Sequence, residues 1–406
     1  MTKTPIRLFP SIAAGAAILL LLACQERLAA PADCPNLCPG GYTVRDTVLT
    51  PVFGTDSGYE GYVLAGQGGS LRVSYQLPAS EDRAVIRFSA RPDSFTFNDT
   101  LRAYTIDSVV LSIGLQYRDT TVKNLVVSLY RLPATLDSGF TFIDADTAFT
   151  PANVIDTFMV ADSVIAGSLT RTFKGATLAQ VLIAPADTGI LAIGVQLRAA
   201  QPTGIRIGSA GGGGLAPLFT TYLHFPTPGD TSTTSRTFVR GPSFARFLSQ
   251  TVPVLDTTVL TVGGAPSSRS VIRFPWPLQL RDSAQLVRVT LELVPTATIL
   301  GLRGDTAFLQ ARPLLADFGG KSPAGTDGFY IAIAPLVDGQ TDTVRLEVRR
   351  AVTLWQGVDG LPPAFMLQLF PEASSFTRAT FGSSRSVGFI PRLRVTYALT
   401  FPFEKP

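Results

Sequence analysis

Alternation of apolar and polar side chains with a period of two is the feature that most limits how this chain of 406 residues can fold. It is clearest in residues 287–293, 344–349 and 392–397, where valine and leucine alternate with arginine, threonine and glutamate. A period of two predicts strands with one buried face and one face in water. Turns rich in Gly, Pro and Asp recur between these segments, and helical periodicity is scarce. We therefore expect an all-β chain built of antiparallel β-sandwiches.

Several segments occur twice in the same order, which indicates an internal repeat. Residues 83–88 (RAVIRF) and 269–274 (RSVIRF) agree at five of six positions. Further matched segments are residues 109–115 with 287–293, 207–209 with 381–383, and 218–222 with 393–397. The repeat predicts two tandem sandwich domains, residues 45–225 and 237–406, joined by a polar linker at residues 226–236.

The N-terminus has the pattern of a secretion signal. Lys3 and Arg7 precede an apolar run at residues 12–22, which is too short for a membrane-spanning helix. Cys24 follows at once and resembles the cysteine of a bacterial lipobox, which implies cleavage after residue 23 and lipidation of Cys24. We expect residues 1–23 to be a signal peptide; a plain signal peptide cut elsewhere is the alternative. Two or more acyl chains anchor a protein stably to a membrane.

The residues after the lipidation site predict an outer-membrane lipoprotein with a short tether. Gln25 follows Cys24 where inner-membrane lipoproteins have aspartate, and residues 24–44 read as the lipidated N-terminus and tether. Whether the chain faces the periplasm or the cell exterior stays open. Cys34 and Cys38 can close a disulfide in an oxidising envelope, and zinc would need two further ligands.

The charge balance gives no reason to expect a nucleic-acid partner. Without Lys3 and Arg7 the chain has 32 basic and 30 acidic residues. Its basic residues are scattered and alternate with apolar ones, and no basic run is interleaved with aromatic residues. This pattern fits the outward faces of strands.

His224 is the only histidine, which excludes most histidine-based catalysis. It lies at the end of an expected strand. The sequence has no Gly-x-Ser-x-Gly motif that would mark the nucleophile of a Ser-His-Asp triad. Paired carboxylates remain an alternative route to glycoside cleavage. Loop residues that offer such carboxylates are Asp56 with Glu60, Asp144 with Asp146, and Asp359. We expect no enzymatic activity, because most such residues cap turns.

Asp144 and Asp146 also suggest a structural calcium ion, since calcium prefers carboxylate oxygens. The other ligands of a calcium loop are missing around them. We expect no other cofactor.

Aromatic rings are a second route to sugar binding, because a flat ring can stack on the apolar face of a sugar. Tyr59 and Tyr62 lie in a polar, glycine-rich segment, Trp276 follows a strand, and Trp355 lies in an expected turn. Packing in the core is the alternative for both tryptophans.

The order of motifs resembles a known family. An Arg-x-Val-Ile-Arg-Phe strand and a Ser-Val-Val-Leu-Ser-Ile strand precede a Val-x-Leu-Trp-Gln-Gly turn at residues 352–357. A Gly-Ser segment and a Pro-Arg-Leu-Arg-Val-Thr-Tyr strand at residues 391–397 follow. This is similar to the DNRLRE-type, disaggregatase-related jelly-roll domain, over residues 45–225 and 237–400. The name-giving string is absent. The resemblance implies a jelly roll akin to carbohydrate-binding modules.

Together these features predict a non-catalytic envelope lipoprotein whose sandwiches bind glycan or cell-surface polysaccharide. One alternative is a structural or adhesive outer-membrane lipoprotein that binds protein partners. A second alternative is a carbohydrate-active enzyme that uses paired carboxylates. In each case the lipid anchor binds the membrane and no nucleic acid is bound.

Overall fold

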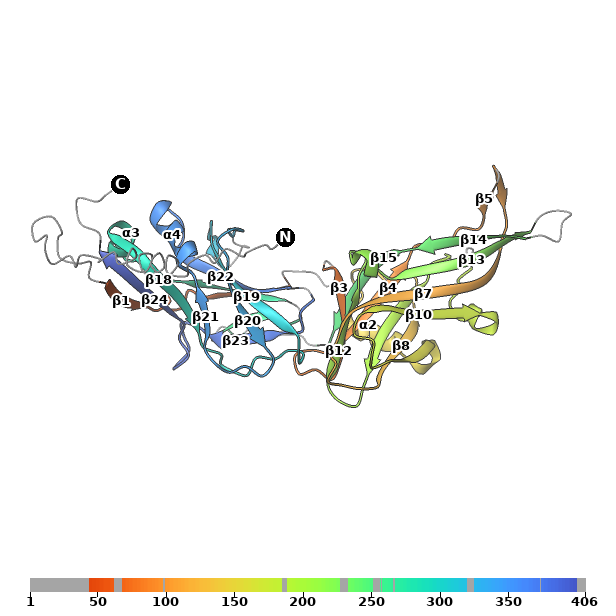
Figure 1. Cartoon of the computed structure of the whole chain (residues 1–406), viewed down its shortest axis with the longest axis horizontal. Helices are drawn as coiled ribbons and strands as arrows, with labels where there is room; N and C mark the ends of the chain where they lie inside the picture. The colour runs from red at the N-terminus through yellow and green to blue at the C-terminus, as the bar shows by residue number, and fades with distance from the viewer. Residues whose placement is uncertain are drawn as a thin grey trace, which may run out of the picture. The chain divides into compact units, whose positions relative to one another are not determined.

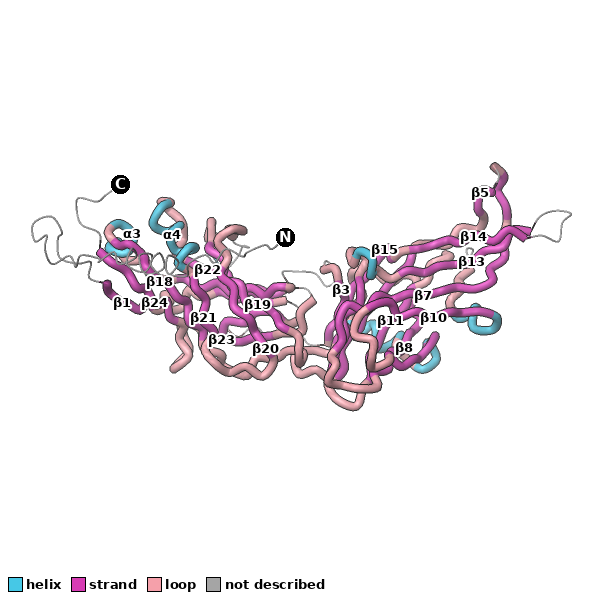
Figure 2. The backbone as a smooth tube through the Cα atoms, in the orientation of Figure 1, coloured by secondary structure: helices cyan, strands magenta, loops and turns pink. Residues whose placement is uncertain are grey.

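The expected all-β fold is confirmed by the computed structural model, in which strands hold 50% and helices 11% of the residues (Figures 1 and 2). The described residues are 44–61, 68–97, 99–184, 188–226, 233–250, 256, 258–265, 267–319, 325–372 and 374–399. The expected signal peptide, Cys24, Cys34, Cys38 and Tyr62 lie outside them. Within those ranges, no helix is long and apolar enough to cross a membrane. Residues Arg45–Pro406 belong to one compact unit, which the following paragraphs describe.

One hydrophobic core lies between two antiparallel sheets that we call the first sandwich. The strand orders are β14-β13-β7-β12-β3, with β10 also on β7, and β15-β4-β11-β8-β9. The strands are β3 (Ser70–Tyr75), β4 (Asp82–Phe88), β7 (Thr105–Arg118), β8 (Leu125–Leu132), β9 (Val154–Val160), β10 (Gly167–Lys174), β11 (Ala192–Arg198), β12 (Thr203–Gly208), β13 (Leu218–Pro226), β14 (Thr233–Arg240) and β15 (Pro242–Ser249), with the hairpin β5 (Phe95–Phe97) and β6 (Thr100–Arg102). Short helices in the connections are α2 (Phe142–Ala148), η2 (Pro151–Asn153), η3 (Gly175–Gln180) and η5 (Gly213–Leu215).

A second core lies between two further sheets, which we call the second sandwich. Their orders are β1-β24-β18-β21 and β20-β19-β22-β17-β16-β23, with β2 also on β17. The strands are β1 (Val44–Leu49), β2 (Ser57–Glu60), β16 (Val259–Gly263), β17 (Ser268–Arg273), β18 (Ala284–Leu293), β19 (Thr306–Pro313), β20 (Ala332–Val337), β21 (Val344–Glu347), β22 (Ala364–Phe370), β23 (Arg378–Gly382) and β24 (Arg392–Leu399). The helices are α3 (Leu278–Asp282) and α4 (Arg349–Gly357).

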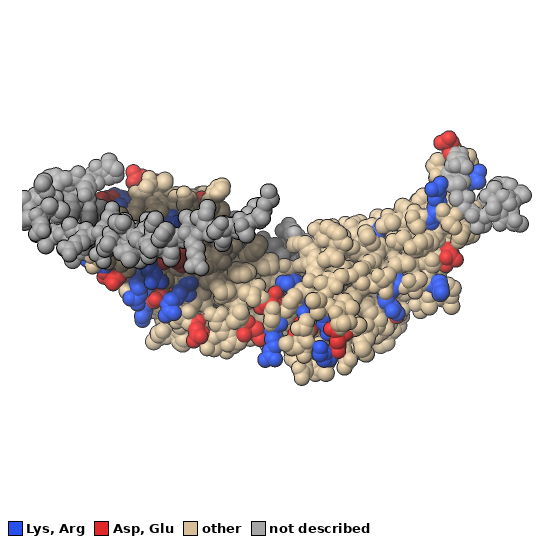
Figure 3. All heavy atoms as spheres, viewed as in Figure 1, with Lys and Arg blue, Asp and Glu red and all other residues tan. Residues whose placement is uncertain are grey.

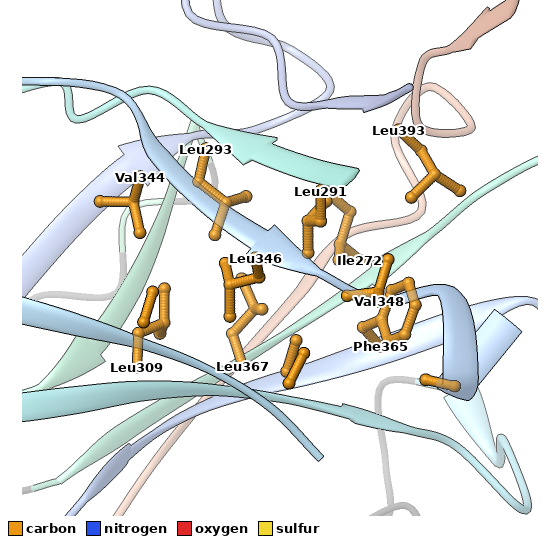
Figure 4. Packing of buried hydrophobic residues seen from close by; sticks show 14 of the residues in the cluster. Ile272, Leu291, Leu293, Leu309, Val344, Leu346, Val348, Phe365, Leu367 and Leu393 are labelled. Carbon is orange, nitrogen blue, oxygen red and sulfur yellow. The ribbon is translucent and has the colours of Figure 1, made fainter. Parts of the chain in front are cut away.

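The period-two pattern places one face of each strand in these cores. In Figure 4, Leu291 of β18 and Leu346 of β21 face Leu309 and Leu367 of the opposite sheet, and all four are buried. Their neighbours Arg345 and Glu347 in β21 point the other way and are exposed. Burial of each large aliphatic side chain contributes about 1.5–3 kcal/mol, so this alternation supplies much of the driving force for folding.

The strand pairing differs from the domain boundaries that we expected from the sequence. β1 pairs with β24 and β2 with β17, so residues 44–60 complete the second sandwich. β14 pairs with β13 and β15 with β4, so residues 233–249 complete the first. The expected linker at residues 226–236 therefore includes the start of a strand. Local sequence specifies that these segments are strands, and it does not specify which sheet edge they meet.

A glycine at the end of one strand in each sandwich lies under a folded-back loop. β12 and β13 follow each other along β7, and the chain between them returns over Gly208. A side chain at Gly208 would overlap the carbonyl oxygen of Leu215, and one at Gly382 would overlap that of Phe389. This close approach of backbones explains why a Gly-Ser segment recurs at residues 208–209 and 382–383.

Arg72 of β3 joins the two sandwiches although it is only 1% exposed. Its guanidinium forms an ion pair of 3.1 Å with Asp82 of β4. It also donates hydrogen bonds to the carbonyl oxygens of Ser375 and Gly264, both in connections of the second sandwich. One buried cation thereby satisfies acceptors on both sides of the contact.

Packing around this pair is aromatic on one side and polar on the other. Phe247 of β15 and Phe376 lie 4.5 and 5.5 Å from the Arg72 guanidinium carbon. The fully buried Asp82 carboxylate accepts further hydrogen bonds from the hydroxyls of Ser80 and Ser249. A buried carboxylate with these partners depends on Arg72 to balance its charge.

Arg273 of β17 fixes the N-terminal strands to the second sandwich. It forms a bidentate pair with Asp317, at 2.5 and 2.8 Å, and donates to Thr55 and Ser57 at the start of β2. Hydrogen bonds from Arg273 lower the pKa of Asp317 below its ordinary value, against the opposing effect of burial.

We predict that Gly208→Ala and Gly382→Ala each destabilise the protein by about 1–3 kcal/mol, because the backbone must move to admit a methyl group. Chemical denaturation followed by fluorescence measures this. Gly214→Ala is the control, since an added Cβ there meets no atom within 4 Å. Equal stability of the three variants would contradict the backbone packing described above.

We predict that Arg72→Met lowers the free energy of unfolding by about 3–5 kcal/mol, because it leaves the Asp82 charge buried without a partner. The matched control is Arg131→Met, which changes an exposed arginine of β8. If the two variants unfold at the same urea concentration, Arg72 does not have the role assigned to it.

The Asp317 carboxylate gives a prediction for acid stability. Because its pKa is lowered in the folded protein, its contribution is present above the ordinary pKa of about 3.9 and is lost as the pH falls through the folded value. The stability difference between the native chain and Asp317→Asn should therefore be largest near neutral pH and shrink below about pH 4. Urea denaturation across this range measures it, with the exposed Asp342→Asn as a control. A difference that grows on acidification would refute the assignment.

Candidate functional site

Arginines from three strands meet on the outer surface of one sheet of the second sandwich. Arg288 of β18, Arg345 of β21, and Arg392 and Arg394 of β24 all point away from the core. We call these four residues the arginine face. On the side drawn in Figure 3, basic side chains with acidic ones beside them gather in the region where Figure 1 labels β24.

Glutamates pair with three of these four arginines and leave them exposed. Glu292 lies 3.5 Å from Arg345 and 3.6 Å from Arg394, and Glu347 lies 3.4 Å from Arg288. The three arginine side chains remain 64%, 49% and 71% exposed. Exposed ion pairs contribute little to stability, so most of the hydrogen-bonding capacity of the guanidiniums stays available to a ligand.

A hollow of about 620 Å³ adjoins the arginine face at Arg288. Its wall includes Arg349 and Arg350, which begin α4, and the aromatic residues Phe329 and Tyr330. Phe329 is 93% exposed and Tyr330 is 40% exposed. A large apolar ring in water costs free energy unless a partner covers it, so such rings beside a hollow indicate a binding surface.

Hydrogen bonds fix the positions of these groups. One carboxylate oxygen of Asp327 accepts from the backbone N–H groups of both Phe329 and Tyr330, each at 2.7 Å. Glu347 accepts from the backbone N–H groups of Val289 and Arg349, each at 3.2 Å. The aromatic turn and the beginning of α4 are thus set before a ligand arrives, which lowers the entropy cost of binding.

This arrangement suits an acidic sugar chain. Guanidiniums bind carboxylate, sulfate and phosphate groups through paired hydrogen bonds, and an aromatic ring offers a flat apolar surface. The two kinds of group lie side by side at one hollow, so a single ligand can contact both.

The aromatic residues expected to bind glycan have other surroundings. Tyr59 lies in strand β2 and packs against the small apolar cluster of Val271, Leu314, Ala364 and Met366. Its hydroxyl donates to the Gly319 carbonyl at 3.0 Å. These contacts leave it poorly placed for stacking on a sugar. Tyr62 lies outside the described residues.

The two tryptophans pack together at the edge of the second core. Trp355 of α4 is 3% exposed, and its ring meets Trp276 edge-on at 5.3 Å and Phe365 at 4.9 Å. The core-packing alternative therefore describes Trp355. Trp276 is half-buried and lines a pocket of about 370 Å³ together with Trp355 and Asp359. Neither indole N–H has a hydrogen-bond partner among the described residues.

Asp144 and Asp146 take separate structural roles. Asp144 completes the N-terminal capping box of α2, and hydrogen bonds from the backbone and hydroxyl of Thr141 lower its pKa. Asp146 pairs with Arg83 at 2.6 Å. In the part of the chain that the structure describes, no three His, Cys, Asp or Glu side chains gather as a metal site would require. The calcium hypothesis thus gains no support from these two carboxylates.

His224 lies within β13 and contacts the neighbouring strand. Its Nδ1 is 3.2 Å from the Ser235 hydroxyl of the neighbouring strand β14. Asp56, one of the candidate catalytic carboxylates, accepts a hydrogen bond from the Ser384 backbone at 2.6 Å. Both residues have local structural partners.

The sequence comparisons leave the family open. No protein-family model matches the chain, and no curated protein matches it. The resemblance to the DNRLRE-type domain stays a prediction that rests on the quoted motifs.

The arginine face was missed in the sequence because its members are far apart in the chain. Each strand shows only one or two arginines in an ordinary alternating pattern. The sheet order β24-β18-β21 brings them together. A signal was present in the adjacent pair Phe329-Tyr330, which follows the turn-forming residues Asp327-Gly328 and is too polar in its surroundings for a core strand.

Proposed function

We propose that this chain is a non-catalytic, lipid-anchored envelope protein that binds an acidic polysaccharide through the arginine face and the adjoining hollow. The observation that carries the proposal is the exposed Phe329 ring beside Arg288, Arg349 and Arg350 in one hollow. A neutral glycan could stack on the Phe329 ring but would have no acidic group for the arginines, whereas an acidic glycan could contact the ring and the arginines together.

The extent of the arginine face favours a polymer over a single small ion. Arg345 of β21 and Arg392 of β24 lie opposite Glu292 of β18, and Arg394 and Arg288 follow at staggered positions along β24 and β18. A chain of acidic sugars laid across them can meet several guanidiniums in succession. Each contact is weak in water, and several contacts together give useful affinity.

Cell-envelope placement is supported by the N-terminal sequence. The apolar run at residues 12–22 and the following Cys24 are features of exported lipoproteins. An acidic polysaccharide of the envelope or cell surface is the ligand that such a location offers. A binding function is also supported over catalysis by the hydrogen bonds and ion pair that His224, Asp56, Asp144 and Asp146 form with neighbouring residues.

The test is retention of the chain, with Cys24→Ser to prevent lipidation, on immobilised polygalacturonate and on neutral dextran. We expect saturable retention on polygalacturonate that falls steeply between about 0.05 and 0.5 M salt, as screening shortens the range of the charges. Phe329→Ala and Arg288→Gln should each weaken binding at least about tenfold if these residues anchor the ligand.

Matched controls separate the site from general surface charge. Phe53→Ala removes another exposed ring, and Arg131→Gln removes an exposed arginine of the first sandwich. Both should bind as the unmodified chain does. Equal binding to dextran and polygalacturonate, or equal losses in all four variants, would refute the proposed site.

A further inference from the structure

Each sandwich is completed by a pair of strands that precedes the other sandwich in the chain. In the chain, β14 and β15 come directly before β16, which belongs to the second sandwich. They nevertheless pair with β13 and β4 of the first sandwich. β1 and β2 lie directly before β3 of the first sandwich, yet they pair with β24 and β17 of the second. The two strand pairs are thus exchanged within one chain.

The two exchanged pairs meet equivalent edges. β15 pairs with β4, the strand of the RAVIRF motif, and β2 pairs with β17, the strand of the RSVIRF motif. Arg87 of β4 contacts Phe244 of β15, and its counterpart Arg273 contacts Ser57 of β2. The two sandwiches therefore receive their completing strands through the same edge of the same motif.

The two pairs also share a sequence pattern. Arg45, Val48 and Pro51 in and after β1 recur with the same spacing as Arg236, Val239 and Pro242 in β14 and at the start of β15. The similar pattern at equivalent sheet edges indicates that β1 with β2 and β14 with β15 are corresponding strand pairs, each of which completes a sandwich.

Several contacts show that the second sandwich has a formed receptor for the N-terminal pair. The Ser384 hydroxyl accepts from the Gly54 backbone at 2.9 Å, and the Ser384 backbone donates to Asp56 at 2.6 Å. Arg385 donates to the Gly54 carbonyl at 2.8 Å. None of these contacts depends on which copy of the chain supplies residues 44–60.

We propose that copies of this protein assemble by strand donation, with β1 and β2 of one copy completing the second sandwich of another. The partner is a second copy of this chain, since only the same residues reproduce the contacts of Gly54, Asp56 and Ser57. An extended segment added to a sheet edge is an established mode of recognition, and exchange of identical elements is a low-cost route to oligomers. The balance between closed and linked chains depends on protein concentration. This proposal does not rest on glycan binding.

The test uses two full-length copies that lack their native cysteines and carry different tags. One copy has Asp46→Cys and the other has Thr396→Cys, because the two side chains are hydrogen-bonded across β1 and β24. After co-expression under oxidising conditions, a mixed disulfide dimer should form at least about tenfold more than in a control pair of Asp46→Cys with Arg131→Cys.

Two further measurements make the result decisive. A single chain with both Asp46→Cys and Thr396→Cys should give internally cross-linked monomers and disulfide-linked oligomers, with the share of oligomers rising with protein concentration. The cysteine-free chain should gain mass in light scattering as its concentration rises from about 1 to about 100 µM. A cysteine-free chain that is a monomer throughout, with no mixed dimer, would overturn the proposal and leave the exchange intramolecular.

Discussion

The buried ion pair between Arg72 and Asp82 lies at the centre of the polar contact between the two sandwiches, which the ion pair of Arg206 with Asp305 extends. A cation that is 1% exposed needs its charge balanced, and Asp82 of the first sandwich supplies the counter-charge while the carbonyl oxygens of Ser375 and Gly264 in the second sandwich accept from its Nη1. Phe247 reaches the same guanidinium from β15, one of the exchanged strands. The contact between sandwiches and the exchange of strands are therefore linked through one side chain.

The backbone hydrogen bonds of β1 and β2 cover two sheet edges of the second sandwich, and they require pairing between distant parts of the chain. Without β1 and β2, the edges of β24 and β17 would expose unpaired backbone groups, which are prone to pair with another chain. With them, the second sandwich is completed by residues that are more than 200 positions away in sequence. Pairing between segments so far apart in the chain raises the contact order, which slows folding.

The sequence predicted what depends on local pattern and failed where distant segments meet. Alternation correctly placed Leu291 and Leu346 in a core, and the recurrent glycines at 208 and 382 have a common steric cause. The edge that residues 44–60 and 233–249 would meet was not predictable, because strands of similar composition fit several edges. Phe329 was missed for a related reason: a single exposed ring in a turn has no periodicity, and its meaning comes from Arg288 and Arg350 beside it.

The exchange also connects the proposed anchor to the proposed binding surface. β1, which the sequence places after the tether that begins at Cys24, is an edge strand of the sheet that carries the arginine face on β24, β18 and β21. Had residues 44–60 completed the first sandwich, as the sequence order alone suggests, the anchor would lead into the other sandwich. Under the proposed function, a pull on a polysaccharide held by Arg394 and Arg288 would pass along the backbone hydrogen bonds of this one sheet to β1. That path would cross no contact between the two sandwiches.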